Sequence, residues 1–505
     1  MPVPGCDQLC GPGTTSENGI CVSELSCGPG TVDVDGACVC TSPCADADAD
    51  GVCDEVDVCP ADPGNDADGD GLCAADDPCP DNPDADCTAC QLDSDWEEID
   101  AVSLAGTLPF RGRFAQHPTT GEIWLGYTRF NTADFTDTSS VVERYDEATG
   151  AFVEEDVLPL GGRFPSGLDF DPSGNLWVTA AIDGHPLLRV RATDGTWSSV
   201  DVGDLEPDQA LSAAPRNSVL VDDDLWMVGD TCLGPSGTSG TGDELRAYLI
   251  VWKYSTADGT VQRVELPMTM VGNLNDGTPI NLSNQGVVSC RRTFPSRIVA
   301  RPDGKVWVVG GMSSWDDPSD PTDDTLIRSE SFVYEGDMTG FIKILEHRPA
   351  DYRSDESFSD AVVVGDTVYL GHSQRSAAGQ QTDWRILAAP LSDLSNLTEL
   401  DHFTIEPGTV DQMDQADDLL YHPPSMQVFA SGNSADSAGQ SFGVVRVGDL
   451  AGFSTSLVDD TPDGFNSFTS QSFLDADHNI WSSTSRFDAA DFDPGEGIIR
   501  RLRCE

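Results

Sequence analysis

The chain has 505 residues, 38% of them hydrophobic, and its 87 Asp and Glu against 27 Lys and Arg give a formal net charge of −60. A chain of this length is expected to fold into more than one domain, each with its own core. The net charge argues against nucleic acid and anionic membrane surfaces as main partners, because both are themselves negative. No run approaches the roughly 18 apolar residues of a transmembrane helix, so the sequence predicts no transmembrane segment.

Residues 1–44 are predicted to form a cysteine-rich, disulfide-stapled module. The phrase Cys-Gly-Pro-Gly-Thr begins at Cys10 and again at Cys27, and each copy ends in a Gly-x-Cys-Val segment. Glycine, proline and cysteine at fixed offsets, with few apolar residues between them, indicate short hairpins held by disulfides. The module resembles cysteine-rich modules near the start of bacterial surface proteins, which implies a role in spacing or adhesion.

The distribution of cysteine predicts an oxidising compartment. Thirteen of the sixteen cysteines lie in the first 90 residues, and such density is typical of secreted or cell-surface proteins. Residues 1–25 lack the basic start and apolar run of an export signal, so we expect that signal to be missing from this sequence. The expected localisation is secreted or on the cell surface of a bacterium.

Residues 45–89 contain two copies of an acidic pattern that is predicted to bind calcium. In each copy three aspartates stand two residues apart, and a glycine follows the third. Calcium takes about six to eight oxygen ligands, and the glycine allows the sharp turn that brings such carboxylates onto one ion. The predicted ligands are Asp46, Asp48, Asp50, Asp54 and Asp57 in the first copy, and Asp66, Asp68, Asp70 and Asp77 in the second.

The two copies also share the spacing of their cysteines, Cys53 and Cys59 in the first, and together they resemble thrombospondin type 3 repeats. The resemblance covers residues 46–87. It implies a segment in which bound calcium takes the place of a hydrophobic core while disulfides pin the loops. The second copy has Ala74 at the position of Asp54, so we expect that loop to bind calcium more weakly or through a water molecule.

Residues 90–505 are predicted to form an all-β domain, a seven-bladed β-propeller. The segments from Phe164 to Val178 and from Phe294 to Val308 share a Phe-Pro-Ser start and a Trp-Val end, and each indicates two strands joined by a tight turn. Related phrases surround seven aromatic residues at intervals of 49 to 81 residues: Trp124, Trp177, Trp226, Trp307, Tyr369, Phe429 and Trp481. This period of short strands is typical of a propeller in which each blade packs one aromatic residue against the next.

The phrase Phe-Asp-Pro-Ser-Gly-Asn-Leu-Trp-Val at 170–178 resembles those of streptogramin-lyase and gluconolactonase-like propellers. The resemblance implies the fold and not an activity, because the phrase serves blade packing in propellers of unrelated function. Six or eight blades are the alternatives, since the 81-residue interval between Trp226 and Trp307 leaves the third blade open to a different division.

The ring is expected to close through the N-terminal strand of the propeller. An open ring would expose two sheet edges, so residues 96–102 should complete the seventh blade beside residues 498–503. Cys90 would then lie near Cys504. Pairing these two, together with Cys232 and Cys290, leaves an even number of cysteines in the N-terminal segments.

A ligand site is expected where the inner strands approach the axis. Alignment of their starts gives a first ring of Gly112, Ser166, Asn217, Ser296, Asp360, Asp417 and Ser470, followed by Arg113, Gly167, Ser218, Arg297, Ala361, Asp418 and Gln471. The predicted ligand-binding residues are Arg113, Ser166, Asn217, Ser296, Arg297, Asp360, Asp417, Asp418, Ser470 and Gln471. Such a ring fits a polar ligand, a water column or an ion, although crowding of seven strands also explains small side chains. Arg297 and Asp360 are expected to project into solvent, where replacement would weaken binding and leave stability unchanged.

The sequence favours a binding function over an enzymatic one. The seven histidines are scattered, and no G-x-S-x-G elbow, H-E-x-x-H helix or Walker loop occurs. We expect a secreted or cell-surface calcium-binding protein whose propeller head binds an extracellular protein or a glycan. The alternatives are an extracellular propeller enzyme, a lyase or hydrolase carried on the same calcium-stabilised stalk, and a structural subunit of a surface filament or layer.

Overall fold

The structure is a computed structural model. In the N-terminal part it describes residues 15–17, 20–22, 31–34 and 37–40. In the propeller it describes residues 92, 95–104, 106–132, 138–157, 162–182, 185–200, 210–233, 246–267, 271–273, 279–281, 293–301, 304–315, 326–347, 356–375, 382–403, 415–436 and 438–504. The nine aspartates predicted to bind calcium lie outside these ranges, so calcium binding stays a prediction.

The chain divides into two compact units, with the boundary after Gln91. The N-terminal unit contains one four-stranded sheet in the order β1-β2-β4-β3. Its strands are β1 (Thr15–Glu17), β2 (Ile20–Val22), β3 (Thr31–Val34) and β4 (Ala37–Cys40). Each of the two Cys-Gly-Pro-Gly repeats therefore contributes one antiparallel hairpin, as the sequence predicts.

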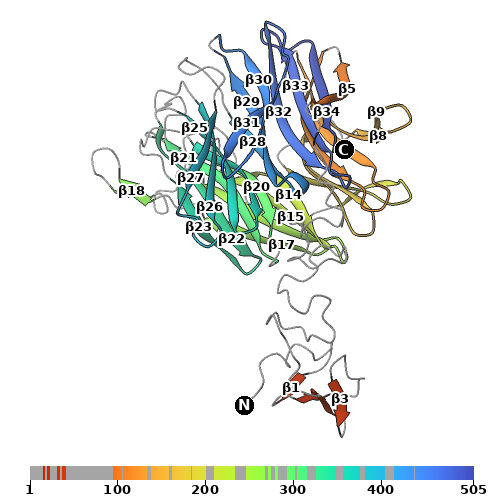
Figure 1. Cartoon of the computed structure of the whole chain (residues 1–505), viewed down its shortest axis with the longest axis vertical. Helices are drawn as coiled ribbons and strands as arrows, with labels where there is room; N and C mark the ends of the chain where they lie inside the picture. The colour runs from red at the N-terminus through yellow and green to blue at the C-terminus, as the bar shows by residue number, and fades with distance from the viewer. Residues whose placement is uncertain are drawn as a thin grey trace. The chain divides into compact units, whose positions relative to one another are not determined.

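The second unit is a seven-bladed β-propeller, which confirms the predicted fold (Figure 1). Each blade is a four-stranded antiparallel sheet. The first three blades are β6 (Thr107–Gln116), β7 (Ile123–Asn131), β8 (Thr138–Asp146) and β9 (Ala151–Val157); β10 (Gly162–Phe170), β11 (Leu176–Ile182), β12 (His185–Arg191) and β13 (Trp197–Val200); and β14 (Ala210–Val221), β15 (Asp224–Leu233), β16 (Arg246–Ser255) and β17 (Val261–Pro267).

The next three blades are β20 (Thr293–Ala300), β21 (Val306–Trp315), β22 (Leu326–Asp337) and β23 (Gly340–His347); β24 (Glu356–Val364), β25 (Thr367–Arg375), β26 (Thr382–Pro390) and β27 (Thr398–Phe403); and β28 (Gln415–His422), β29 (Gln427–Ala435), β30 (Ser441–Asp449) and β31 (Gly452–Val458). The long third interval holds an additional hairpin, β18 (Val271–Asn273) with β19 (Pro279–Asn281), between blades 3 and 4. This insertion accounts for the 81-residue spacing without changing the number of blades.

The seventh blade combines the two ends of the propeller sequence. It contains β32 (Phe465–Leu474), β33 (Ile480–Asp488), β34 (Gly495–Leu502) and β5 (Glu97–Leu104), in that order. The orange β5 lies beside the blue β34 in Figure 1, and the two strands pair antiparallel. The predicted ring closure is therefore confirmed. Leu92 also bridges to Cys504, which supports a Cys90–Cys504 bond, although Cys90 lies outside the described residues and the bond stays a prediction.

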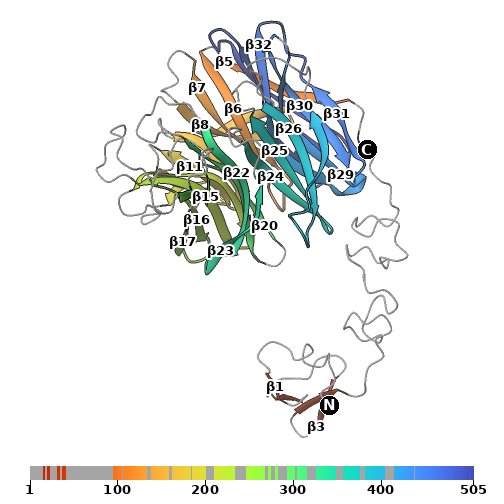
Figure 2. The same ribbon diagram turned by 90° about the vertical axis from the view of Figure 1, so that its left-hand side faces the viewer.

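The first strand of each blade lies at the centre of the ring. β6, β10, β14, β20, β24, β28 and β32 each contact the next in this order, and β32 contacts β6. Four of these strands, β6, β20, β24 and β32, are labelled in Figure 2. Side chains on these seven strands therefore meet around the axis. Within the described residues no helix is long and apolar enough to cross a membrane.

The hydrophobic core is divided among the blade interfaces. The described residues form seven buried clusters, and each joins two neighbouring blades around one of the predicted aromatic residues. Trp177 of blade 2, for example, packs with Leu225 and Met227 of blade 3, and Trp481 of blade 7 packs with Phe114 of blade 1. All seven aromatic residues are buried near the start of the second strand. The predicted packing of one aromatic per blade is confirmed.

A tight turn explains why tryptophan follows an Asp-x-x-x-Asn phrase at 171–177 and 475–481. Asp475 Oδ1 accepts hydrogen bonds from the backbone N–H of Asp477 and Asn479, at 3.0 and 2.8 Å. Its Oδ2 accepts one from Trp481 Nε1 at 2.7 Å. Asp171 makes the same set of bonds, with Trp177 Nε1 at 2.9 Å. One aspartate thus fixes the turn and also satisfies the polar atom of a buried indole.

We expect Asp475→Ala to lower the free energy of unfolding by about 1–3 kcal/mol, because the buried indole N–H of Trp481 loses its acceptor and the turn loses its cap. Asp477→Ala is the matched control, since Asp477 is an exposed residue of the same turn. Chemical denaturation followed by tryptophan fluorescence measures both variants. Equal midpoints for Asp475→Ala and Asp477→Ala would contradict this role.

Candidate functional site

Every inner strand contains an irregularity at the same level. In five blades a single extra residue forms a β-bulge against the second strand: Arg216, Ser296, Ser359, Asp417 and Ser470. In blades 1 and 2 the shift falls between Phe110 and Arg113 and between Arg163 and Gly167. Bulges bend a strand and increase its twist, and their recurrence marks one structural level around the axis.

The register corrects two members of the predicted ring. Asn217 and Asp360 do not occupy bulge positions; they stand one residue later, paired with the second strand like Arg297 and Asp418. The bulge positions in their blades belong to Arg216 and Ser359. The ring after the bulge therefore consists of Arg113, Gly167, Asn217, Arg297, Asp360, Asp418 and Gln471. Proline at 215 and 295 marks the correct alignment, because each directly precedes the extra residue.

Three members of this corrected ring fasten one blade to the next. Asn217 Oδ1 accepts a hydrogen bond from the backbone N–H of Ile298 in blade 4, at 3.0 Å. Asp360 Oδ2 accepts from Leu419 N–H in blade 6, and Asp418 Oδ2 from Ser472 N–H in blade 7, both at 2.9 Å. In each case the donor directly follows the ring position of the neighbouring blade. We call these three bonds the inter-blade latches.

Arg297 of blade 4 contacts the two latch aspartates of blades 5 and 6. Its Nε lies 3.3 Å from Asp360 Oδ1, and its Nη2 forms a hydrogen-bonded ion pair with Asp418 Oδ1. The two carboxylate side chains are 2% and 1% exposed, and the arginine side chain is 19% exposed. One guanidinium therefore pairs with two buried carboxylates that come from different blades, and we call these three residues the axial triad.

This geometry corrects the expectation that Arg297 and Asp360 project into solvent. Both oxygens of Asp360 accept backbone N–H groups, from Ala361 at 2.7 Å and from Leu419. Their replacement is therefore expected to change stability, because an unpaired buried charge is costly. Burial raises the pKa of the Asp360 carboxyl, as does the neighbouring Asp418 charge, while Arg297 opposes the rise.

Asp169 is a further carboxylate of the axial region, half-buried, that sequence reasoning missed. Its Oδ2 accepts a hydrogen bond from Ser218 Oγ in blade 3 at 3.3 Å. Burial raises the pKa of Asp169 to about 6, against the opposing charges of Arg113 and Arg297. The close approach of blades 2 and 3 here also explains Gly167, since a Cβ at this position would lie 1.5 Å from Ser218 Oγ. Asp169 stands two residues after the ring position Gly167, so both lie on the same face of β10. This spacing could have identified Asp169 from the sequence.

The remaining predicted residues have different environments. Ser166 is 3% exposed and donates to the backbone oxygen of Thr179, so it serves packing within its blade. Gln471 is also buried. Arg113, Ser296, Asp417 and Ser470 are half-buried and keep some contact with solvent. Among the described residues no group of three or more His, Cys, Asp or Glu side chains is placed to hold a metal.

No protein-family model and no curated protein sequence matches this chain. The chain is similar in structure to a polysaccharide lyase, Uly1, at 10% identity over 81% of this chain and 100% of the other, with a TM-score of 0.45. A protein of unknown function from Dyadobacter fermentans DSM 18053 is 12% identical over 81% and 99% of the two chains, with a TM-score of 0.40.

The Pseudomonas aeruginosa periplasmic gluconolactonase PpgL is 13% identical over 69% of this chain and 84% of its own, with a TM-score of 0.39. Likeness at these identities and scores assigns no activity to the chain. The seven-bladed fold rests on the strand pairing described above.

Proposed function

We propose that this chain is a secreted or cell-surface calcium-binding protein whose propeller head binds an extracellular partner or a glycan. The observation that carries the proposal is the axial triad, in which Arg297, Asp360 and Asp418 are bound to one another and to the backbone of neighbouring blades. Groups held in this way stiffen the head, and a preorganised surface loses less conformational freedom when it binds. Recognition then falls to the half-buried axial residues and to the loops.

The calcium-binding part of the proposal is supported by the two acidic repeats of residues 45–89, and export is supported by the concentration of cysteine in the first 90 residues. The net charge of −60 of the whole chain favours a neutral or basic partner over an anionic glycan. Calcium would neutralise part of this charge and stiffen the segment that carries the head.

A glycan array with neutral, acidic and amino sugars, probed with the full chain in calcium buffer, tests the head. We expect binding to neutral or amino sugars, weakened by Asp417→Ala in a variant that still unfolds cooperatively, since Asp417 is half-buried at the axis. Glu147→Ala, in the exposed turn after β8, is the control and should bind like the wild type. Absence of binding to every glycan and to extracellular proteins immobilised in parallel would contradict the proposal.

One observation favours a second candidate, an extracellular propeller enzyme of the lyase or hydrolase class. Asp169 lies in the axial region, where its Oδ2 accepts a hydrogen bond from Ser218 Oγ of the next blade. Desolvation raises the pKa of Asp169 to about 6, close to the range in which a carboxyl works as a general acid or base. Turnover of polysaccharides and lactones by the full chain tests this candidate. Turnover that Asp169→Asn abolishes in a folded protein supports an enzyme, whereas no turnover on any of these substrates eliminates it.

A further inference from the structure

The inter-blade latches share one geometry. Each uses the backbone N–H of the residue that directly follows the ring position of the next blade. In all seven blades the residue at this place pairs with the one after the buried aromatic residue of the second strand: Phe114, Leu168, Ser218, Ile298, Ala361, Leu419 and Ser472. Backbone N–H groups alternate in direction along a strand, so the shared register gives Phe114 N–H the direction of the three latch donors, toward the preceding blade.

Gln471 has the ring position of blade 7, and Phe114 follows the ring position of blade 1. By the geometry of the latches, Gln471 Oε1 should therefore accept a hydrogen bond from Phe114 N–H. Gln471 is 9% exposed, and its Oε1 is buried with no hydrogen-bond partner among the described residues. A buried acceptor without a donor is costly. The seam between blades 7 and 1 thus contains both halves of a latch that is not formed.

A small cavity lies in the same seam. Its volume is about 30 Å³, and its walls come from β5, β33 and β34 of blade 7 and from β6, β7 and β8 of blade 1. Ser483, which pairs with Gln471, and Leu125, which pairs with Phe114, both line it. The cavity therefore adjoins the position of the unformed latch.

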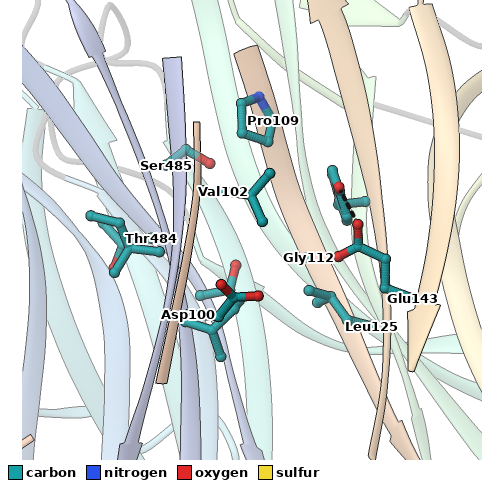
Figure 3. Close-up of a pocket in the computed structure, with 13 residues that line it drawn as sticks. Asp100, Val102, Pro109, Gly112, Leu125, Glu143, Thr484 and Ser485 are labelled. Atoms are coloured by element: carbon teal, nitrogen blue, oxygen red, sulfur yellow. Dashed lines mark hydrogen bonds between the residues drawn. The ribbon is translucent and has the colours of Figure 1, made fainter. Parts of the chain in front are cut away.

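The two blades face each other across this cavity. Figure 3 shows Thr484 and Ser485 of blade 7 on one side and Gly112 and Leu125 of blade 1 on the other. Protein interiors are normally close-packed, and atoms beside a void lack contacts on that side. An approach of the two blades would recover these contacts and shorten the gap in the latch.

Other hydrogen bonds hold the periphery of this seam. Gln116 Oε1 accepts one from Ala476 N–H at 2.7 Å, at one end of the inner strands. Asp100 Oδ2 on the outer strand β5 accepts one from Phe152 N–H of β9 at 3.1 Å. The chain also continues directly from β5 of blade 7 into β6 of blade 1. A movement in the axial part of the seam therefore does not require the ring to open.

We propose that the seam between blades 7 and 1 is a two-state element. The loose state is the one in this structure, and in the tight state Gln471 Oε1 accepts a hydrogen bond from Phe114 N–H and the cavity is closed. Two packed arrangements of one interface can both be populated when their free energies are close. Since Phe114 directly follows the axial residue Arg113, the transition would also move the axial ring. The inference goes beyond the proposed binding function, and its test needs no ligand.

Hydrogen–deuterium exchange of the full chain, resolved to single amides by mass spectrometry, tests the proposal. Time spent in the tight state protects Phe114 N–H, so Gln471→Ala should raise its exchange rate about tenfold, the equivalent of one lost hydrogen bond. Leu419 N–H, which is bound by the latch of Asp360, is the internal reference and should keep its rate. An unchanged rate at Phe114 in Gln471→Ala would overturn the proposal.

Two further variants separate the latch from packing. Gln471→Glu keeps an acceptor of nearly the same shape, as the carboxylates of Asp360 and Asp418 do in their latches, and should retain the protection of Phe114 N–H. Gln262→Ala, on the exposed face of β17, should leave the rate unchanged. Equal loss of protection in Gln471→Glu and Gln471→Ala would assign the effect to packing and overturn the latch, also where Gln471→Ala raises exchange throughout the chain.

Filling the cavity distinguishes a two-state seam from a seam with one fixed packing. Val102 of β5 lines the cavity, and Val102→Ile adds one methylene there. Because the added group blocks the closure of the cavity, it disfavours the tight state, and Phe114 N–H should exchange faster than in the wild type. In a seam with one fixed packing the same change fills a void, which makes exchange slower or leaves it unchanged. Slower or unchanged exchange in Val102→Ile would therefore overturn the two-state seam.

Discussion

Replacement of Arg297 by alanine is expected to lower the free energy of unfolding by about 3–5 kcal/mol, because it leaves two buried carboxylates without a counter-charge. Asp360 and Asp418 are 2% and 1% exposed, so solvent cannot stabilise their charges in place of the guanidinium. Equilibrium denaturation followed by tryptophan fluorescence measures the loss. Arg263→Ala, on the exposed face of β17, is the control and should remain within about 0.5 kcal/mol of the wild type.

A double variant distinguishes charge from packing. Asp418→Asn added to Arg297→Ala removes one of the two stranded charges, so the double variant should recover part of the lost stability. The loss in Arg297→Ala should also be smaller at acidic pH. The pKa of Asp360 is already raised by burial and rises further without the guanidinium, and a carboxyl with a raised folded-state pKa stabilises the fold as it takes up a proton. A wild-type midpoint for Arg297→Ala would contradict the triad.

The second large effect is expected at Asp459, which joins blade 6 to blade 7. Its side chain is fully buried and pairs with Arg486 Nη2 at 2.9 Å and with Arg500 Nη2. It also accepts a hydrogen bond from Thr461 Oγ1 at 2.7 Å. Asp459→Ala leaves the mostly buried Arg500 without its carboxylate and leaves Arg486 with Glu496 alone, so we expect a loss of about 3–5 kcal/mol in the free energy of unfolding.

Asp460→Ala is the matched control for this site, because Asp460 is the exposed neighbour in sequence. It should leave the free energy of unfolding within about 0.5 kcal/mol of the wild type. Similar losses for both variants in urea denaturation would show that the blade 6 to blade 7 loop, and not the buried ion pairs, accounts for the effect.

The pH dependence at Asp459 follows from the direction of its pKa. Burial opposes ionisation, but the hydrogen bond from Arg486 and the charge of Arg500 outweigh it and lower the pKa. A lowered folded-state pKa contributes stability above the unfolded value, about 3.9, and that contribution disappears as pH falls below it. The difference between wild type and Asp459→Ala should therefore shrink below about pH 4.

The blade architecture could be predicted because each blade repeats a local pattern. Trp177 and Trp481 follow Asp-containing turns whose hydrogen bonds lie within seven residues of sequence, so the pattern is visible without the fold. Closure by β5 follows from the same logic, since the last blade lacked one strand and an open edge is unfavourable. The predicted number of blades was correct despite the insertion of β18 and β19, because Trp226 and Trp307 still identified the blades on either side of it.

The axial region was predicted only in part. Arg297, Asp360 and Asp418 were identified as axial residues, yet their pairing depends on which blades are neighbours and on one bulge in each inner strand. A bulge shifts every later residue by one position and reverses the face to which its side chain points. The sequence alignment missed this shift at Asn217 and Asp360, and at Asp360 it assigned solvent contact to a carboxylate that is buried.

Limited proteolysis of the full chain with calcium and with a chelator, read by mass spectrometry, tests the proposed calcium-binding function most directly. Residues 45–89 contain almost no large apolar side chains, so order in this segment must come from bound ions and disulfides. The account predicts that calcium protects this segment, that the chelator exposes cleavage sites within it, and that the propeller fragment stays intact in both conditions. Equal cleavage of residues 45–89 with and without calcium would contradict it.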